Sequence, residues 1–324
     1  MDRRTLLKTI AAGTAASAAP WAAAQSLPDQ PLRWIVPYPA GGGTDVLART
    51  VAEAMRETLG QQVVIDNRPG ASTNIGAQIV ATAKPDGGTF MSADNAVLAF
   101  NEHLFSKLPF NPEKDFTYIG GISRFPLALV VHPAFEAQTL KDFIAYAKAN
   151  PGKLNYASPG NGSPHHLAME MFKLRTGTFI THIPYRGAGP ALQDLIGGNV
   201  DMMFDGLGSS AAHIKGGRIK ALMVSGTKRN PAFPDVPCAA EVGLPDYTVT
   251  TWYGLWAPKG TPADVQAKIV EEIRKLGSFD ELKSIWANNG ADYGGMTQQQ
   301  FAAFVSGEVK RWSEVVKASG AKLD

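Results

Sequence analysis

The chain has 324 residues, of which 44% are hydrophobic and 19% are charged, with 31 basic against 29 acidic residues. This composition excludes a disordered or fibrous protein and is enough for one large or two ordinary domains with real cores. Because the sequence has no run of lysine or arginine, its charge balance argues against a nucleic-acid or anionic-membrane partner held by bulk charge.

The N-terminus, MDRRTLLKTIAAGTAASAAPWAAAQS, has a basic start, an alanine-rich apolar middle and the small-residue sequence AAA before Gln25. This pattern predicts a signal peptide over residues 1–24, with cleavage after Ala24, and therefore an exported protein. Arg3 and Arg4 leave two export routes open, the ordinary secretory route and the twin-arginine route. No later apolar run approaches the roughly 18 residues that cross a bilayer.

The stretch IVPYPAGGGTD, residues 35–45, joins a predicted strand in PLRWIV to a predicted helix. Thr44 is expected to cap this helix and Asp45 to lie in its first turn, where a carboxylate suits the helix dipole. The glycines either make only a tight turn or expose a surface of bare backbone. Apolar residues then recur at helical spacing, at Val46, Leu47, Val51, Ala54, Met55 and Leu59.

Strands and helices alternate along the rest of the chain. Strands are predicted in QQVVIDN, after the turn PDGG, and in KLNYA, FITHIPY, VDMMF and RIKALMVSG. Helices are predicted in NIGAQIVATAK, TLKDFIAYAKAN, PALQDLIGG and SSAAHIKGG, and after Ser163 and Pro164, which together form a strong helix start. This alternation predicts an α/β protein whose parallel sheets are covered on both faces.

A glycine-rich loop between strand and helix occurs twice, at residues 39–45 and 158–164, which suggests two lobes. GGISRFPLALVVHP is expected to lead out of the first lobe and YTVTTWYGLWAPKGTP to lead back into it. We therefore predict that residues 27–124 and 251–324 form lobe 1 and residues 125–250 form lobe 2. Trp252, Tyr253 and Trp256, on the return segment, either wall a pocket or fill the core below the hinge.

Both loops would present backbone N–H groups at helix N-termini, where unpaired amides and the helix dipole favour an anion. Neither matches a nucleotide loop, because GGGTD lacks the lysine of G-x-x-x-x-G-K-[ST] and does not follow G-x-G-x-x-G. A ligand carboxylate could be held in this way, with phosphate as the competing anion. From these loops the candidate ligand-binding residues are Gly41, Gly42, Gly43, Thr44, Gly162 and His166.

An alternative function is a secreted serine hydrolase that uses Ser158 or Ser163 with His165 or His166. No G-x-S-x-G elbow occurs in the sequence, and adjacent helical residues point about 100° apart, which prevents the two histidines from sharing a metal easily. We predict no catalytic residue, metal site or cofactor. Cys238 is either a reactive nucleophile or a small inert side chain.

Three polar residues follow predicted strands, at the edge where open parallel sheets bind their ligands. Asp205 ends VDMMF, and it either contacts the ligand or caps the next helix. Tyr185 and Arg186 end FITHIPY in the same way. Arg186 could offer a fork to a carboxylate, or it could lie solvated at the rim.

The sequence resembles the periplasmic solute-binding proteins of tripartite tricarboxylate transporters, also called Bug-type receptors. The resemblance covers essentially the whole mature chain, in the ordered motifs PYPAGGGTDVLAR, VIDNRPGASTNIGA, KPDGGTF, KLNYASPGNGSPHHLA, HIPYRGAGPALQDLIGG, VDMMFDG, DVPCAAEVGLPDY and GLWAPKGTP. Gly88, Phe90, Cys238 and a short connection at LGSFDELK depart from the family pattern, outside the two predicted ligand loops.

The resemblance implies a two-lobed periplasmic-binding-protein fold of the Venus flytrap, type II-like kind, with the ligand cleft between the lobes. It implies a periplasmic receptor that holds a small carboxylated metabolite and delivers it to membrane permease subunits. A receptor that only senses its ligand is an alternative. The family pattern places around the cleft Tyr38, Ala40, Asp45, Ser158, Asn161, Ser163, Tyr185 and Asp205.

Overall fold

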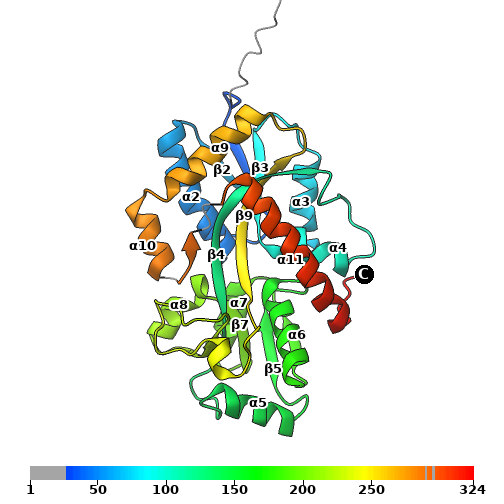
Figure 1. Cartoon of the computed structure of the whole chain (residues 1–324), viewed down its shortest axis with the longest axis vertical. Helices are drawn as coiled ribbons and strands as arrows, with labels where there is room; N and C mark the ends of the chain where they lie inside the picture. The colour runs from blue at the N-terminus through cyan, green and yellow to red at the C-terminus, as the bar shows by residue number, and fades with distance from the viewer. Residues whose placement is uncertain (1–26, 289, 294–295) are drawn as a thin grey trace, which may run out of the picture.

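The computed structural model of the chain describes residues 27–288, 290–293 and 296–324. The predicted signal peptide, residues 1–24, lies outside the described residues. Two α/β lobes are stacked along the long axis of the molecule, and two long strands run from one into the other (Figure 1). The predicted α/β class with two lobes is thereby confirmed.

The first lobe is built on three parallel strands, with β1 (Leu32–Val36) between β2 (Val63–Asn67) and β3 (Thr89–Ala93). Every residue of β1 except Arg33 is buried, as expected for a central strand covered on both faces. The helices of this lobe are α2 (Gly43–Leu59), α3 (Asn74–Ala81), α4 (Asn101–Leu104), α9 (Ala263–Leu276), α10 (Asp280–Asn288) and α11 (Gln298–Ser319), with the short 3₁₀ helix η1 (Ala71–Thr73) and the π-helix η2 (Ala96–Phe100).

The second lobe repeats this arrangement, with β5 (Asn155–Ser158) parallel to both β6 (Thr181–Pro184) and β7 (Met202–Gly206). Its other elements are β8 (Lys220–Val224), α5 (Leu140–Ala149), α6 (Pro164–Thr176), α7 (Ala188–Ile196), α8 (Leu207–Lys215) and the turn η3 (Ala239–Val242). Helix α6 starts as predicted, because the Ser163 hydroxyl accepts a hydrogen bond from the His166 N–H and Pro164 is the first helical residue.

Strand β4 (Phe116–Val131) passes through both lobes. Its residues Phe116–Pro126 pair with β9 (Thr250–Pro258) and, at one end, with β10 (Asp292–Tyr293), whereas Leu127–Val131 pair with β7 and β8. All four pairings are antiparallel, so the sheets are mixed and the prediction of purely parallel sheets is wrong for β4. The connections between the lobes are extended strands, and in the strand order β9 lies between β3 and β4, while β4 lies between β9 and β7.

Helix α11 packs over the base of these crossing strands and reaches α6 of the second lobe (Figure 1). Trp252 and Trp256 are 1% and 0% exposed, and Phe301 of α11 packs edge-on against Trp252. The Glu308 carboxylate accepts hydrogen bonds from the indole N–H groups of Trp252 and Trp312, at 3.0 and 3.1 Å. Two of the three aromatic residues on the return segment therefore fill the core.

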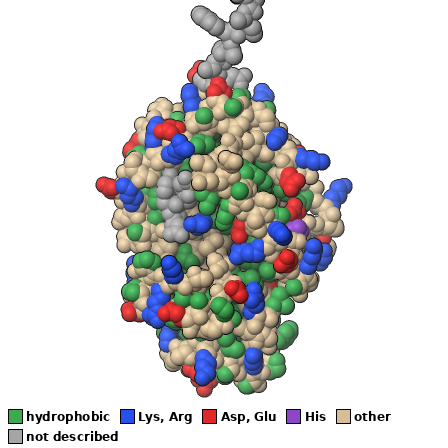
Figure 2. Space-filling model, in the orientation of Figure 1, with side chains coloured by type: hydrophobic (Ala, Val, Ile, Leu, Met, Phe, Trp, Pro, Cys, Tyr) green, Lys and Arg blue, Asp and Glu red, His purple; other side chains and the backbone are tan. Residues whose placement is uncertain are grey.

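Basic and acidic side chains are interspersed over the face shown in Figure 2. Within residues 27–288, 290–293 and 296–324, no helix is both long enough and apolar enough to cross a membrane.

Candidate functional site

A cavity of about 430 Å³ lies between the lobes, a volume in the usual range for small-molecule sites. First-lobe residues reach it from the loop after β1, the start of α2, the end of β3, strand β9 and helix α10. Second-lobe residues reach it from the loop after β5 and from the starts of α6, α7 and α8. Of the predicted ligand-binding residues, it is lined by Tyr38, Ala40, Gly41, Gly42, Gly43, Thr44 and Ser163.

The loop after β1 brings bare backbone to this cavity. Helix α2 begins at Gly43, and its N-cap is Gly42, which offers no side chain to the first N–H groups of the helix. The prediction that Thr44 caps the helix is therefore wrong, because the N-cap lies two residues earlier, at Gly42, and the Thr44 hydroxyl instead hydrogen-bonds with Tyr253. The first amides of α2 are left for a ligand.

Asp45 holds this loop in place and does not line the cavity. Its carboxylate accepts hydrogen bonds from the Gly41 N–H at 2.8 Å, from Asn67 Nδ2 at 2.9 Å and from Arg49 Nε at 3.0 Å. Burial raises the pKa of Asp45, but the hydrogen bonds from Arg49, Gly41 and Asn67 outweigh burial and leave the pKa below its usual value. Asn67 also donates to the Tyr38 carbonyl, at 3.1 Å. The Asn67 side chain therefore holds both ends of the loop, at Tyr38 and at Asp45.

Two helices of the second lobe point their N-termini at the same cavity. Gly187 is the N-cap of α7 and Gly206 is the N-cap of α8, and neither helix has a side-chain cap. The cavity is lined there by Gly187, Ala188 and Gly189 from α7 and by Gly206, Gly208 and Ser209 from α8. Glycine N-caps on three helices, from both lobes, therefore surround one space with uncapped amides and the positive ends of three helix dipoles.

In the second glycine loop, residues 158–163, two backbone N–H groups already donate hydrogen bonds to nearby side chains. The Gly160 N–H donates to Ser158 Oγ at 3.2 Å, and the Gly162 N–H donates to His166 Nδ1 at 3.2 Å. Gly162 has a φ of +75°, and a Cβ there would lie 2.8 Å from Leu323 and 2.9 Å from Leu104, both in the first lobe. This loop is a contact between the lobes as well as a wall of the site.

Residues of the same loop line a smaller cavity, of about 390 Å³. Asn161, Gly162 and Tyr185 line it, and the Tyr185 hydroxyl donates to Asp194 at 2.7 Å. The two cavities share Tyr38, Pro39, Pro159, Ser163, Arg186 and Gly187. The exposed Arg186 thus lies where the two cavities meet, and a Cβ on Gly187 would be 3.9 Å from Pro39 Cγ across the cleft.

Ser158 and His166 lie behind the cleft in a stack of rings and line neither cavity. Ser158 is fully buried and its Oγ lies 2.7 Å from His182 Nε2. The His182 ring stacks against both Tyr156 and His166, and burial lowers the pKa of His182 to about 3 and that of His166 to about 4. Ser158 is thereby held away from both cavities. Ser163 and His165, the other pair of the hydrolase alternative, both line the larger cavity, where the Ser163 hydroxyl accepts a hydrogen bond from the His166 N–H and caps α6.

The floor of the larger cavity is polar. Asp94, at the end of β3, lines it, and its carboxylate accepts from the Tyr38 hydroxyl at 2.7 Å and from the Ala96 N–H at 3.0 Å. Burial raises the pKa of Asp94 despite these bonds. His165 also lines the cavity, and its Nε2 lies 3.5 Å from Oδ1 of the fully buried Asp205. Asp205 itself lines neither cavity, and its other oxygen accepts from the Ser209 hydroxyl at 2.7 Å.

Several lining residues were not predicted as ligand-binding. Asp94 follows a parallel strand in the same way as Asp205, so the strand-end pattern that singled out Asp205 could have found it. Tyr253 lines the cavity, unlike the two tryptophans beside it. Apolar residues from four separate elements complete the lining, and no short motif marks them: Val46, Leu47, Phe125, Leu192, Leu282 and Trp286.

Two further features bear on the chemistry of the site: groups of residues that could hold a metal ion, and the position of Cys238. No group of three histidine, cysteine, aspartate or glutamate side chains that could hold a metal occurs within the part of the chain that the structure describes. Cys238 is buried, 1% exposed, at the start of η3 in the second lobe, away from both cavities. Its burial favours the small inert side chain over the reactive nucleophile.

Comparison with known proteins identifies the family of this chain. The model of the tripartite tricarboxylate transporter family receptor, TctC, matches residues 47–321. Protein BugT of Bordetella pertussis is 36% identical over 324 residues, which is 100% of this chain and 99% of BugT.

Solved structures agree. R. palustris Rpa4515 with adipate is 35% identical with a TM-score of 0.87, over 91% of this chain and 99% of that one. The periplasmic binding protein BugD is 33% identical with a TM-score of 0.85, over 91% and 99%. MatC from Rhodopseudomonas palustris, with bound malate, is 33% identical with a TM-score of 0.84, over 89% and 99%. These matches confirm the predicted periplasmic-binding-protein fold, and the chain belongs to the family of tripartite tricarboxylate transporter receptors.

Proposed function

We propose that this protein captures a small carboxylate in the larger cavity and delivers it to the membrane permease subunits of a tripartite tricarboxylate-type transporter. The observation that carries the proposal is the convergence of three glycine-capped helix N-termini, from α2, α7 and α8, on one space between the lobes. Adipate and malate, the ligands of two similar structures, are both carboxylates.

The amides are sufficient for useful affinity. A hydrogen bond to a charged group contributes roughly 1.5–3 kcal/mol net, and micromolar binding needs about 8 kcal/mol. Three or four such bonds from the helix starts contribute about 4.5–12 kcal/mol, a range that includes micromolar affinity without a lysine or arginine. The Arg186 guanidinium, at the junction of the two cavities, is free to add to this attraction when the lobes close.

The remaining parts of the proposal concern the whole chain. Residues 1–24 direct export and are removed near Ala24, which places the receptor in the periplasm. Residues 27–124 with 251–324 form one closing body, and residues 125–250 form the other. The change of partners along β4 between Pro126 and Leu127 supports a boundary close to residue 125. Tyr38, Gly42, Gly43 and Ser163 are the contacts that we assign to the carboxylate end of the ligand.

A thermal-shift screen tests this function. The mature protein is unfolded and refolded to remove carried-over ligand, then heated with small carboxylates, with phosphate and sugars as controls. A ligand at 100 times its Kd adds about 2.7 kcal/mol, a shift of several degrees. Shifts confined to carboxylates are expected. A shift with phosphate alone would contradict the proposal.

The Gly42→Val variant tests the site within that screen. A Cβ on Gly42 would meet only the Pro39 carbonyl, at 3.6 Å, and φ is −79°, so the fold accepts the side chain while the cavity loses space. We expect loss of the ligand-dependent shift with little change in the ligand-free melting temperature. Gly307→Val, on α11 with open space around it, is the matched control. Gly162→Val is unsuitable, because its clashes with Leu104 and Leu323 would disturb the fold.

A further inference from the structure

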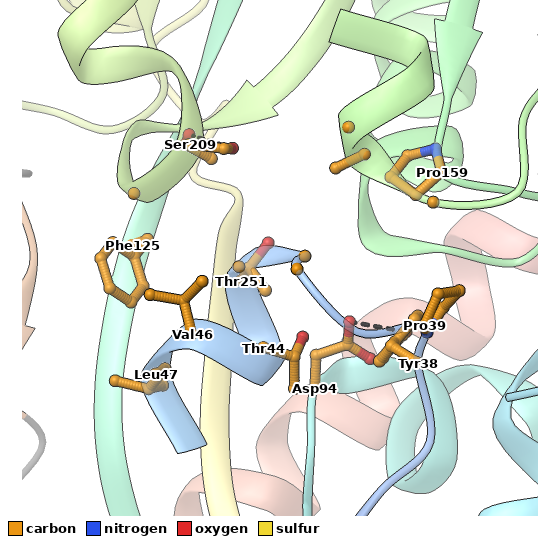
Figure 3. Close-up of a pocket in the computed structure, with 18 of the residues that line it drawn as sticks. Tyr38, Pro39, Thr44, Val46, Leu47, Asp94, Phe125, Pro159, Ser209 and Thr251 are labelled. Carbon is orange, nitrogen blue, oxygen red and sulfur yellow. Dashed lines mark hydrogen bonds between the residues drawn. The ribbon is translucent and has the colours of Figure 1, made fainter. Parts of the chain in front are cut away.

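One side of the larger cavity is apolar. Val46 and Leu47, on the first turns of α2, face it together with Phe125 of β4, and Figure 3 shows these three on one side with Pro39 and Pro159 on the other. Leu282 and Trp286 from α10 and Leu192 from α7 complete this side, so both lobes contribute to it. We call these six residues the apolar wall.

Val46 is the member that packing does not explain. Its side chain remains 55% exposed, although it lies on the first turn of α2 next to the uncapped amides. Phe125 packs edge-on against Tyr253, with ring centroids 5.9 Å apart, and Gly208 of α8 makes room for it, since a Cβ there would lie 3.1 Å from the Phe125 ring. Phe125, Leu192, Leu282 and Trp286 are thus buried parts of the cavity lining, and Val46 is the member whose side chain is exposed.

Charged side chains are placed elsewhere around the cavity. Arg186 belongs to the residues shared with the smaller cavity, which include Pro39 and Pro159 on the side opposite Val46. Asp94 and His165 lie on the polar floor, and with Arg186 they are the only Asp, Glu, Lys, Arg or His side chains that the described residues contribute to the lining. A ligand group that lies against the apolar wall is thus desolvated without a charged partner, which penalises hydroxyl and carboxylate groups there.

We propose that the ligand of this site is a carboxylate with an apolar body, an alkyl chain or an aromatic ring. Its carboxylate lies at the α2 amides, and its hydrocarbon part lies against Val46, Leu47 and Phe125. A short hydroxylated acid can bind the α2 amides through its carboxylate, but it does not cover the apolar wall, which then remains in contact with water. This inference rests on the proposed carboxylate-binding function and narrows its ligand class.

Titration calorimetry on the refolded mature protein tests the inference with two pairs of probes, each of constant charge. Hexanoate is compared with lactate, and adipate with malate, so that the charge is constant within a pair while the more apolar acid has the longer hydrocarbon chain and lacks the hydroxyl group. Each buried CH₂ changes the Kd roughly fourfold, so the more apolar acid should bind at least about tenfold more tightly in both pairs. Its binding should also show the more negative heat-capacity change that marks apolar burial.

Two variants locate the effect on the wall. Val46→Thr keeps the shape of the side chain and places a hydroxyl against the ligand, so it should weaken hexanoate binding several-fold more than lactate binding. Val64→Thr is the matched control, because Val64 is similarly exposed, at 48%, on β2 and lines neither cavity. It should leave the ratio of the two affinities unchanged.

The outcomes separate this inference from the function beneath it. Tighter binding of lactate and malate, or equal effects of Val46→Thr on hexanoate and lactate, would overturn the apolar-body inference and leave carboxylate binding standing. If none of the four acids binds and the wider carboxylate screen also shows no shift, the proposed function itself fails.

Discussion

Replacing Asp45 by asparagine should weaken the hydrogen bonds that hold the glycine loop, residues 39–45, in place. The carboxylate accepts from the Gly41 N–H, Asn67 Nδ2 and Arg49 Nε, all within 3.0 Å, and its side chain is only 4% exposed. An amide of the same shape has one acceptor oxygen, and its NH₂ group would face at least one of these donors. Leaving a buried donor unpaired costs about 1–3 kcal/mol, and more when the partner is charged.

We therefore expect Asp45→Asn to lower the free energy of unfolding by about 2–4 kcal/mol, and the melting temperature by roughly 5–10 °C. Urea titration measures the first and a thermal scan the second. Because Gly41 is then no longer held, carboxylate affinity should fall as well, and calorimetry with the best acid from the screen measures this fall.

Asp66→Asn is the matched control. Asp66 lies on β2 beside Asn67 and pairs with Arg33 and Arg68, whose side chains are 41% and 49% exposed. Exposed ion pairs of this kind contribute about 0–1 kcal/mol, so this variant should change stability little and binding not at all. If Asp45→Asn behaves like Asp66→Asn in both assays, the account of how these hydrogen bonds hold the loop is refuted.

Two further changes test the interior. Burial lowers the pKa of His182 to about 3 and that of His166 to about 4, whereas both are about 6.5 in the unfolded chain. Because the unfolded state therefore takes up protons first, the free energy of unfolding should fall as the pH drops from about 6.5 towards about 4. His182→Gln should flatten this slope in urea titrations across that window, whereas an unchanged slope would show that the ring stack does not carry it. Both indole N–H groups donate to Oε2 of Glu308, and Oε1 lies 2.9 Å from the Arg311 guanidinium, so Glu308→Gln removes the charge on this acceptor and turns an NH₂ group toward either the indoles or Arg311. It should cost about 1–3 kcal/mol of stability, and a cost below about 0.5 kcal/mol would count against the hydrogen bonds described.

Local signals in the sequence were sufficient for much of the fold. The alternation of short apolar strands with amphipathic helices predicted the α/β class, and Ser163 with Pro164 marked the start of α6 correctly. Both depend on residues close in the chain, so their physics is visible in a short window. The same holds for the glycine loop before α2, whose lack of side chains is itself the feature that the site uses.

The start of α2 shows where this local reasoning stops. Thr44 has a good capping side chain, but its hydroxyl hydrogen-bonds with Tyr253 of β9, more than 200 residues away in the chain, and Gly42 takes the N-cap position. Asp45, expected near the ligand, is held instead by Asn67 and the Gly41 N–H. In both cases a long-range contact, which no short window contains, decided what a local preference left open.

The sequence by itself therefore determined the elements, the two-lobed family and the exposed backbone that suits a carboxylate. Only the tertiary structure decided which amides face the same space and which polar residues, such as Ser158 and Asp205, lie buried behind it. It also assembled the apolar wall, whose members come from α2, β4, α7 and α10. The physical reason is that a cavity is a property of surfaces brought together by packing, and residues that share one need no regular spacing in the chain.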